Sequence, residues 1–157
     1  MVLKRTLREV RLLRMLDHKN ILVIHSIMKP ADTNNFRDVY LVTELMETDL
    51  SSVIKSTQSL LPDHVLFFIY QLVAGMEHIH KHQILHRDIK PRNLLVNSNC
   101  ELKICDFGLA RVNMTGMTPL AMPRMTDYVA SRWYRAPELI LGKLKLSNRI
   151  LFETFVI

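Results

Sequence analysis

Residues 86–93 read His86-Arg87-Asp88-Ile89-Lys90-Pro91-Arg92-Asn93, and the triplet Asp106-Phe107-Gly108 begins thirteen residues after Asn93. A further triplet, Ala136-Pro137-Glu138, follows along the chain. Carboxylate and amide side chains at these intervals supply oxygen ligands of the kind that Mg²⁺ prefers. Each motif alone could be an ordinary capped turn, but three motifs in this order argue against coincidence.

These side chains suit phosphoryl transfer, in which a carboxylate orients the attacking hydroxyl and oxygen ligands hold Mg²⁺ against a triphosphate. Asp88 suits the first role, and Asn93 and Asp106 suit the second. Lys90, two residues after Asp88, can neutralise charge that develops on the γ-phosphate. Gly108 is expected to let the backbone turn sharply after the metal ligand.

The first part of the chain is expected to hold one helix and two strands. Leu3–Leu16 has apolar residues at helical spacing with Arg and Lys on the other face, which predicts an amphipathic helix. Ile21–Ile27 and Val39–Thr43 are β-branched runs that predict strands.

The longest helix is expected to begin at Pro62, with Asp63 as its N-cap. Short strands are predicted at Ile84–Leu85, Leu94–Val96 and Leu102–Ile104, and an irregular segment from Asn113 to Asp127. Small strands with one helix, followed by a more helical part, predict an α+β fold in two lobes. The long helix should also carry one apolar stripe that needs a partner surface, made of Val65, Ile69, Leu72, Met76 and Ile79.

Composition narrows the class of protein. The 157 residues are 48% hydrophobic and carry a net charge of +6, but the basic residues are spread along the chain without interleaved aromatic side chains, so no nucleic-acid partner is expected. No apolar run approaches the ~20 residues of a membrane span, so no membrane partner is expected either. Cys100 and Cys105 are expected to be free thiols. Among His78, His80, His82 and His86, the first three are two residues apart, which argues against a zinc site.

These motifs resemble those of eukaryotic protein kinases. Thr126-Asp127-Tyr128, followed by Val129-Ala130-Ser131-Arg132-Trp133-Tyr134-Arg135-Ala136-Pro137-Glu138, is similar to the activation segment of the MAP kinase family. Thr6-Leu7-Arg8-Glu9-Val10 and Leu45-Met46-Glu47-Thr48-Asp49-Leu50 also resemble MAP kinase sequence. The likeness runs from about Lys4 to Leu141 and implies a partial two-lobe kinase fold.

The resemblance implies three regions. Residues 1–46 would be the remnant of a small lobe that ends in the hinge, with the C-helix and the two strands that precede the hinge. Residues 47–142 would be the first half of the large lobe, with the catalytic loop and activation segment, and residues 143–157 a divergent tail. Leu13, His86 and Phe107 match members of the apolar spine that links the lobes.

The resemblance also implies an ATP and Mg²⁺ site. Glu9 matches the C-helix glutamate that pairs with the ATP-anchoring lysine, and Thr43 matches the gatekeeper. Glu44 and Met46 match hinge residues that contact adenine through their backbone. The remaining matches are Asp49 on the ribose side, Leu95 beneath adenine, Asp88, Lys90 and Asn93 as catalytic residues, and Asn93 and Asp106 as metal ligands.

The activation switch implied by the family is a pair of phosphorylation sites, Thr126 and Tyr128. A phosphate adds roughly −1.5 to −2 charge and favours guanidinium partners. Arg8, Arg87 and Arg111 match the partners of a phosphate on Thr126, and Arg132 and Arg135 those of a phosphate on Tyr128. A solvated basic surface is the alternative interpretation of any one arginine.

The function implied is that of a cytoplasmic Ser/Thr protein kinase, with nuclear entry left open, which transfers the γ-phosphate of ATP to Ser/Thr-Pro sites of protein substrates. Its upstream partner would be a dual-specificity MAP kinase kinase. Cys105, just before Asp106, is either reachable by covalent ligands of the ATP site or a buried, inert thiol.

Two features depart from the family pattern. Residues 1–157 contain neither the glycine-rich loop nor the lysine that pairs with Glu9, and no Asp-x-Trp segment follows Glu138. Arg149–Ile157 matches nothing in the family. The large-lobe helices that cover the apolar stripe of the long helix in the family are missing from residues 1–157, so this stripe is expected to be left exposed. Loss of one preorganised electrostatic contact can cost on the order of 3–4 kcal/mol in transition-state stabilisation. The alternative expectation is therefore a catalytically inactive kinase fragment, which either binds partners or has no function.

Overall fold

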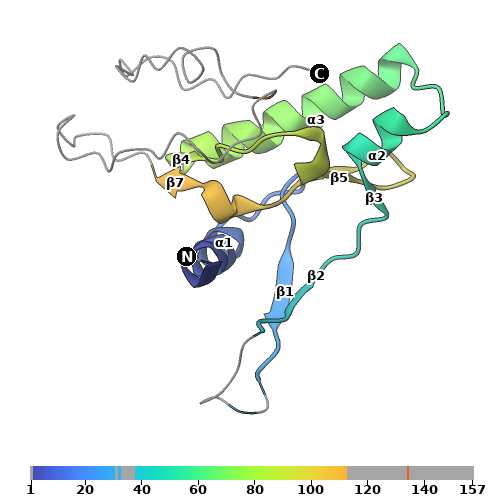
Figure 1. The fold of residues 1–157 in the computed structure, drawn as a ribbon. Coiled ribbons are helices and arrows are strands. Elements are labelled where there is room, and N and C mark those ends of the chain that lie inside the picture. Colours follow the sequence, from blue (N-terminus) through green and yellow to red (C-terminus); the bar gives the residue numbers. More distant parts are fainter. Residues whose placement is uncertain (1, 31, 33–37, 113–133, 135–157) are drawn as a thin grey trace.

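The computed structural model describes residues 2–30, 32, 38–112 and 134. The chain begins with helix α1 (Val2–Met15), and a turn then leads into the antiparallel hairpin of β1 (Ile24–Ile27) and β2 (Leu41–Thr43). The hairpin extends away from the rest of the molecule (Figure 1). The sequence predicted α1 to within one residue, whereas both strands are shorter than expected, and Ile21 forms only an isolated bridge with Ile104.

Two helices follow the hairpin. Helix α2 (Leu50–Lys55) is capped by Asp49, whose carboxylate accepts hydrogen bonds from the backbone N–H and hydroxyl of Ser52. Helix α3 (Pro62–Lys81) crosses the whole molecule (Figure 1). Its N-cap is Leu61, and Asp63 lies in the first turn, so the prediction of Asp63 as N-cap is wrong. Pro62 occupies the first helical position, where its missing N–H leaves no intrahelical bond unmade.

The strands of the larger part are short and belong to two small sheets. The first has the order β3 (Thr48–Asp49), β5 (Leu94–Val96) and β6 (Leu102–Ile104), all antiparallel. The second pairs β4 (Ile84–Leu85) with β7 (Arg111–Val112). Two 3₁₀ turns, η1 (Pro91–Asn93) and η2 (Phe107–Leu109), connect them. The bounds predicted for β4, β5 and β6 are confirmed.

One hydrophobic core joins α1, α3 and the small sheets. Its most deeply buried members come from segments far apart in the sequence, and each is less than 2% exposed. Because these side chains, except that of His86, belong to one cluster that also includes Ile89, the loop around Asp88 and the Asp106 segment share their packing with both long helices. The largest of these side chains are Phe107, Ile21, Ile79, Ile84, Leu102, Ile104, His86 and Val96.

The buried face of α3 differs from the predicted stripe. Leu72, Met76 and Ile79 are buried, so the expectation that the stripe is left exposed is wrong for these three, whereas Ile69 is exposed. Phe68, Gln71 and Gly75 complete the buried face. A second set of large apolar side chains on α3 is exposed to solvent, namely Leu66, Phe67, Tyr70 and Val73. The stripe was mispredicted because α3 has apolar residues around most of its circumference, so periodicity does not identify the packed face.

A buried amide pair fastens the turn after α1 to α3. The side-chain Nδ2 of Asn20 donates to Gln71 Oε1 at 3.1 Å and to the carbonyl of Leu102 at 2.9 Å. Gln71 Oε1 also accepts from the N–H of Leu102 at 3.0 Å, and Gln71 Nε2 donates to the carbonyl of Cys100 at 2.8 Å. Gly75 permits this close approach, because a Cβ there would lie 2.8 Å from Ile104 Cδ1.

Replacing Gln71 with Ala should lower the free energy of unfolding by about 2 kcal/mol or more, since the buried N–H of Leu102 and carbonyl of Cys100 would lose their side-chain partner. Urea unfolding followed by circular dichroism measures the change. Gln58→Ala is the matched control because Gln58 is exposed. Equal stability of the two variants would contradict the role of Gln71.

Candidate functional site

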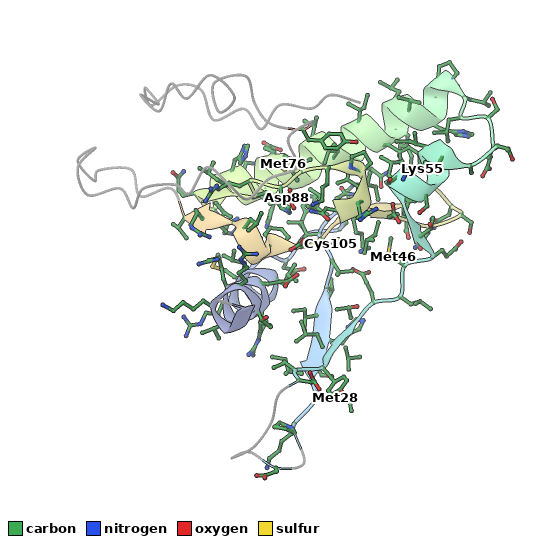
Figure 2. All side chains as sticks on the ribbon, viewed as in Figure 1. Met28, Met46, Lys55, Met76, Asp88 and Cys105 are labelled. Carbon is green, nitrogen blue, oxygen red and sulfur yellow. The ribbon has the colours of Figure 1, made fainter. Side chains whose placement is uncertain are left out.

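The loop between β4 and β5 gathers the three predicted catalytic residues around one carboxylate. Lys90 Nζ lies 2.6 Å from Asp88 Oδ2, and Asn93 Nδ2 donates to the same oxygen at 3.1 Å and to the carbonyl of Asp88 at 2.8 Å. Asp88 and Asn93 are only 6% and 5% exposed. No described residue hydrogen-bonds the other carboxylate oxygen, Oδ1. Figure 2 shows where Asp88 lies in the fold. Asp88 is therefore held rigidly with one oxygen left to accept a proton.

The buried ring of His86 holds this loop in place. Its ring is fully buried, its Nε2 lies 3.0 Å from the carbonyl of Cys105, and its Nδ1 accepts the N–H of Asp88 at 3.3 Å. The ring also meets Phe107 edge-on, with centroids 4.7 Å apart. Burial lowers the pKa of His86 to about 4, so the ring is neutral at pH 7. Neutrality is required here because only an unprotonated Nδ1 can accept from Asp88.

This neutral histidine makes stability depend on pH. The pKa of His86 in the folded chain lies below its value of about 6.5 in the unfolded chain. The unfolded chain therefore binds more protons as the pH falls, and the free energy of unfolding decreases below about pH 6.5. The loss should reach about 3 kcal/mol near pH 4.

Comparison of His86→Phe with the unmutated chain tests this dependence. We expect urea unfolding between pH 7 and pH 5 to give a flatter stability profile for His86→Phe, whereas a control at exposed His25, His25→Phe, should keep the original slope. Parallel profiles for all three chains would show that His86 is not the titrating group.

Asp106 lies at the end of β6 in a left-handed backbone conformation, with φ 62°. Its Oδ1 accepts from the N–H of Gly108 at 3.3 Å and so caps η2. Gly108 itself does not have a positive φ, so the prediction that Gly108 makes the sharp turn is wrong. The short polar side chain of Asp106 tolerates the left-handed region by bonding locally. Gly108 is needed instead for space, since a Cβ there would lie 3.2 Å from Asp106 Oδ1.

Asn93 and Asp106 fit the role of metal ligands. The N–H of Cys105 donates to the carbonyl of Asn93 at 3.0 Å, which fixes the segment before Asp106 against η1. The Asn93 amide nitrogen is used by Asp88, which leaves its Oδ1 as the ligand atom, and Asp106 is exposed. Two oxygens of this kind suit Mg²⁺ bound together with phosphate oxygens.

Helix α1 brings Glu9 to the same region. Burial, and after it the negative charge of Asp106, raises the pKa of Glu9. Within the described residues no Lys or Arg forms an ion pair with Glu9. The arrangement thus places two carboxylates near each other, which favours a cation between or beside them.

The predicted hinge is stabilised by its side chains. Glu44 Oε1 accepts from the N–H of Val23 at 2.8 Å, and Oε2 lies 2.8 Å from Lys103 Nζ. The Thr43 hydroxyl donates to the carbonyl of Glu44 at 3.1 Å. Lys103 was not predicted from the sequence, because its role depends on the position of β6, of which it is the central residue, next to the hinge. The ion pair holds the hinge against the strand that leads to Asp106.

Two predicted nucleotide-site residues are direct partners across a sheet. Asp49 pairs with Leu95 in the register of β3 and β5. Leu95 is half-buried between two buried neighbours, so its side chain projects from the opposite face of the strand. Met46, also half-buried, precedes β3 (Figure 2).

Four arginines converge beside η2. Arg8 donates from its NH1 group to the carbonyl of Gly108 at 2.8 Å, and Arg111 bonds the carbonyl of Ala110 at 2.8 Å. Burial, followed by the charges of Arg8, Arg87 and Arg5, lowers the pKa of Arg111. The structure thus brings together the three predicted arginines. It adds Arg5, which lies one helical turn before Arg8 and Glu9 on α1. The sequence did not single out Arg5, because basic residues are ordinary on the solvent-exposed face of a helix.

The two predicted phosphorylation sites lie outside the described residues, as do the arginines assigned to the second phosphate. These are Thr126, Tyr128, Arg132 and Arg135. The irregular segment predicted from Asn113 to Asp127 also lies outside them.

The surroundings of Cys105 bear on the two alternatives for its thiol. Its Sγ lies 3.4 Å from the carbonyl of Asn93. Burial, followed by the charges of Asp106, Glu9 and Asp49, raises its pKa to about 12. Since the thiolate is the nucleophile, the geometry favours the inert alternative. Cys100 and Cys105 are both free, as predicted.

Alkylation by iodoacetamide at pH 8 should be roughly 10³-fold slower for Cys105 in the folded chain than in the urea-unfolded chain, because the thiolate fraction falls with the raised pKa. Mass spectrometry of tryptic peptides measures both rates. Using Cys100→Ser removes the second thiol. Comparable rates in the two states would contradict the assignment.

Comparison with known proteins agrees with this geometry. The protein kinase domain model matches residues 1–150. The chain belongs to the protein kinase family. It is 54% identical over 139 residues to the mitogen-activated protein kinase homolog NTF6 of Nicotiana tabacum, which covers 88% of this chain and 36% of that protein.

Two further relatives are similar at the same level. Mitogen-activated protein kinase 5 of Arabidopsis thaliana is 52% identical over 147 residues, or 94% of this chain and 38% of its own length. Mitogen-activated protein kinase 4 of Oryza sativa subsp. japonica is 56% identical over 137 residues, or 87% of this chain and 36% of its own length. The resemblance to MAP kinases is confirmed, and the chain spans somewhat more than a third of these relatives.

Metal-binding clusters and membrane-spanning helices are both missing from the part of the chain that the structure describes. The described residues contain no group of three or more His, Cys, Asp or Glu side chains that could hold a metal ion, and this includes the four histidines from His78 to His86. No helix in the same residues is long and apolar enough to cross a membrane.

Proposed function

We propose that this protein is a MAP kinase-type Ser/Thr kinase that transfers the γ-phosphate of ATP to Ser/Thr-Pro sites in protein substrates. The observation that carries the proposal is the buried Asp88 carboxylate, held through one oxygen by Lys90 and Asn93. A general base must be fixed within reach of the proton that it accepts, and this arrangement fixes it.

Each residue then has a role set by its contacts. Asp88 Oδ1 accepts the proton of the substrate hydroxyl. Lys90, already 2.6 Å from Asp88 Oδ2, supplies positive charge beside the transferred group. Asn93 Oδ1 and the Asp106 carboxylate would hold Mg²⁺, which when bound neutralises charge on the phosphates.

Activation is proposed to act through the arginines beside η2. A phosphate on Thr126 would contact Arg8, Arg87 and Arg111. These three come from α1, the catalytic loop and β7, so one phosphate would join the helix that carries Glu9, the loop that carries Asp88 and the segment that follows Asp106. The second phosphate, on Tyr128, would bind Arg132 and Arg135, and a dual-specificity MAP kinase kinase would add both.

A second candidate is a catalytically inactive, partner-binding chain. It is favoured by Glu9, for which no described Lys or Arg supplies an ion pair. A chain of this kind would keep the fold of the loop around Asp88 without efficient transfer.

The test is transfer of phosphate from Mg-ATP to a Ser-Pro peptide after treatment with an active MAP kinase kinase. We expect Asp88→Asn to lower the rate by at least about 10²-fold, since it removes the proton acceptor. Asp38→Asn, at an exposed position, is the matched control and should retain the rate. A Ser-Ala peptide tests the requirement for proline.

Transfer that persists in Asp88→Asn would refute the role of Asp88. Absence of transfer by the unmutated chain, together with no thermal shift on Mg-ATP, would establish the inactive candidate instead.

A further inference from the structure

Three histidine rings stack where the turn after α1 meets the end of α3. His18, on the turn, lies 4.9 Å from His78 between ring centroids, with the planes inclined by 28°. His78 lies 4.5 Å from His82, with an angle of 45°. His78 is in the last turn of α3, and His82 is its C-cap. The site described above uses none of these rings.

The hydrogen bonds of the stack suit neutral rings. The N–H of Asn20 donates to His18 Nδ1 at 3.1 Å, so that nitrogen must carry no proton. His82 Nδ1 lies 2.9 Å from the carbonyl of His78. His78 Nε2 is buried and has no hydrogen-bond partner within the described residues. A proton at His18 Nδ1 would replace an acceptor with a donor facing the Asn20 N–H.

Asn20 connects the stack to the buried core. Its side chain holds Gln71 and the carbonyl of Leu102, and its own carbonyl accepts from the N–H of Ile104 at 2.9 Å. Displacing the Asn20 backbone would therefore disturb bonds to both α3 and β6. The stack sits directly beside the residue that fastens the turn.

The charges that face the stack partly oppose each other. Asp17 and Lys19 flank His18 on the turn, and exposed Glu77 and Lys81 pair at 2.9 Å on α3. For His18, burial, the charge of His78 and that of Lys19 lower the pKa, while Asp17 and Glu77 raise it, and the net direction is down.

His78 and His80 behave in the same direction. Burial, the charge of His82 and that of Lys81 lower the pKa of His78, and Asp17 raises it, with a net lowering. His80, on the neighbouring face of α3, has its pKa lowered by burial. Neutral rings are thus the favoured state of the folded chain at both ends of the His18–His78 contact.

We propose that the stack of His18, His78 and His82 is a pH-sensitive clasp, which holds the turn after α1 on α3 while the His18 and His78 rings are neutral and releases it when these two rings are protonated in mildly acidic solution. Protonation places like charges within 5 Å of each other and removes the acceptor for the Asn20 N–H. The pKa values of His18 and His78 are lower in the folded chain than in the unfolded chain, so protonation favours the unfolded chain. The clasp is therefore fully formed above about pH 6.5 and is lost as the pH falls.

The clasp has a consequence for α1. That helix ends at Met15, immediately before the turn, and carries Arg8, which bonds the carbonyl of Gly108. Loosening the turn would free one end of α1 and weaken its hold on η2. Acidification would act on the helix through its C-terminal anchor, without contact to the loop around Asp88.

The experiment follows the imidazole signals of the ¹³C-histidine-labelled chain by NMR from pH 8 to pH 5, together with hydrogen exchange of the Asn20 amide. We expect His18 and His78 to titrate below about pH 6.5. The opening equilibrium of Asn20, corrected for intrinsic exchange, should rise at least about threefold over the same interval.

His78→Phe separates the clasp from other titrating groups, because Phe keeps a ring in the stack but binds no proton. In this variant the rise in Asn20 opening should shrink and the His18 midpoint should increase. The control His25→Phe, at an exposed site on β1, should change neither. If His78→Phe does not fold, His82→Ala serves in its place with the same expected shift for His78. Titration of His18 and His78 unaffected by these changes, or Asn20 opening independent of pH, would overturn the proposal.

Discussion

The buried, neutral ring of His86 is the contact on which the rest of the site depends. It joins the carbonyl of Cys105 to the N–H of Asp88, and so links the segment that ends β6 to the loop that follows β4. A charged ring could not make both bonds, and a smaller side chain would leave both backbone groups buried without partners. The position of Asp88 relative to Asp106 is thus set by an uncharged residue that touches no substrate.

The second requirement is that α1 stay fastened to this centre from both directions. Arg8 bonds η2 directly, while the turn after α1 is held by Asn20 and Gln71 against α3 and β6. Both attachments are polar. The amides of Asn20 and Gln71 are buried, and a shift of Gln71 would leave the N–H of Leu102 and the carbonyl of Cys100 without their side-chain partner, which favours a single arrangement. These two attachments fix the position of α1 and so hold Glu9 near Asp106.

Much of this could be predicted from the sequence, and the failures have physical causes. The short strands β4, β5 and β6 were predicted correctly because polar turns bound each apolar run. Asp88, Lys90 and Asn93 were singled out by their spacing, and the structure brings the three side chains into contact. The turn at Asp106 was assigned to Gly108 because glycine is the usual residue at positive φ, whereas a local hydrogen bond let Asp adopt it. Arg5 and Lys103 could not be predicted, since their roles arise only when distant segments meet. The packed face of α3 could not be predicted either, because this helix has apolar side chains around most of its surface.

The electrostatics around η2 show what the site requires to be complete. On one side, burial and then the charge of Asp106 raise the pKa of Glu9. On the other, burial and then the charges of Arg8, Arg87 and Arg5 lower the pKa of Arg111. Each arrangement is less favourable alone than with a partner of opposite sign, so binding a cation on one side and an anion on the other stabilises both. Since α1 contributes to both groups, neutralising either one favours the same position of the helix. The proposed phosphate on Thr126 would act in this way on the proposed metal ligands, although it would lie away from Asp88.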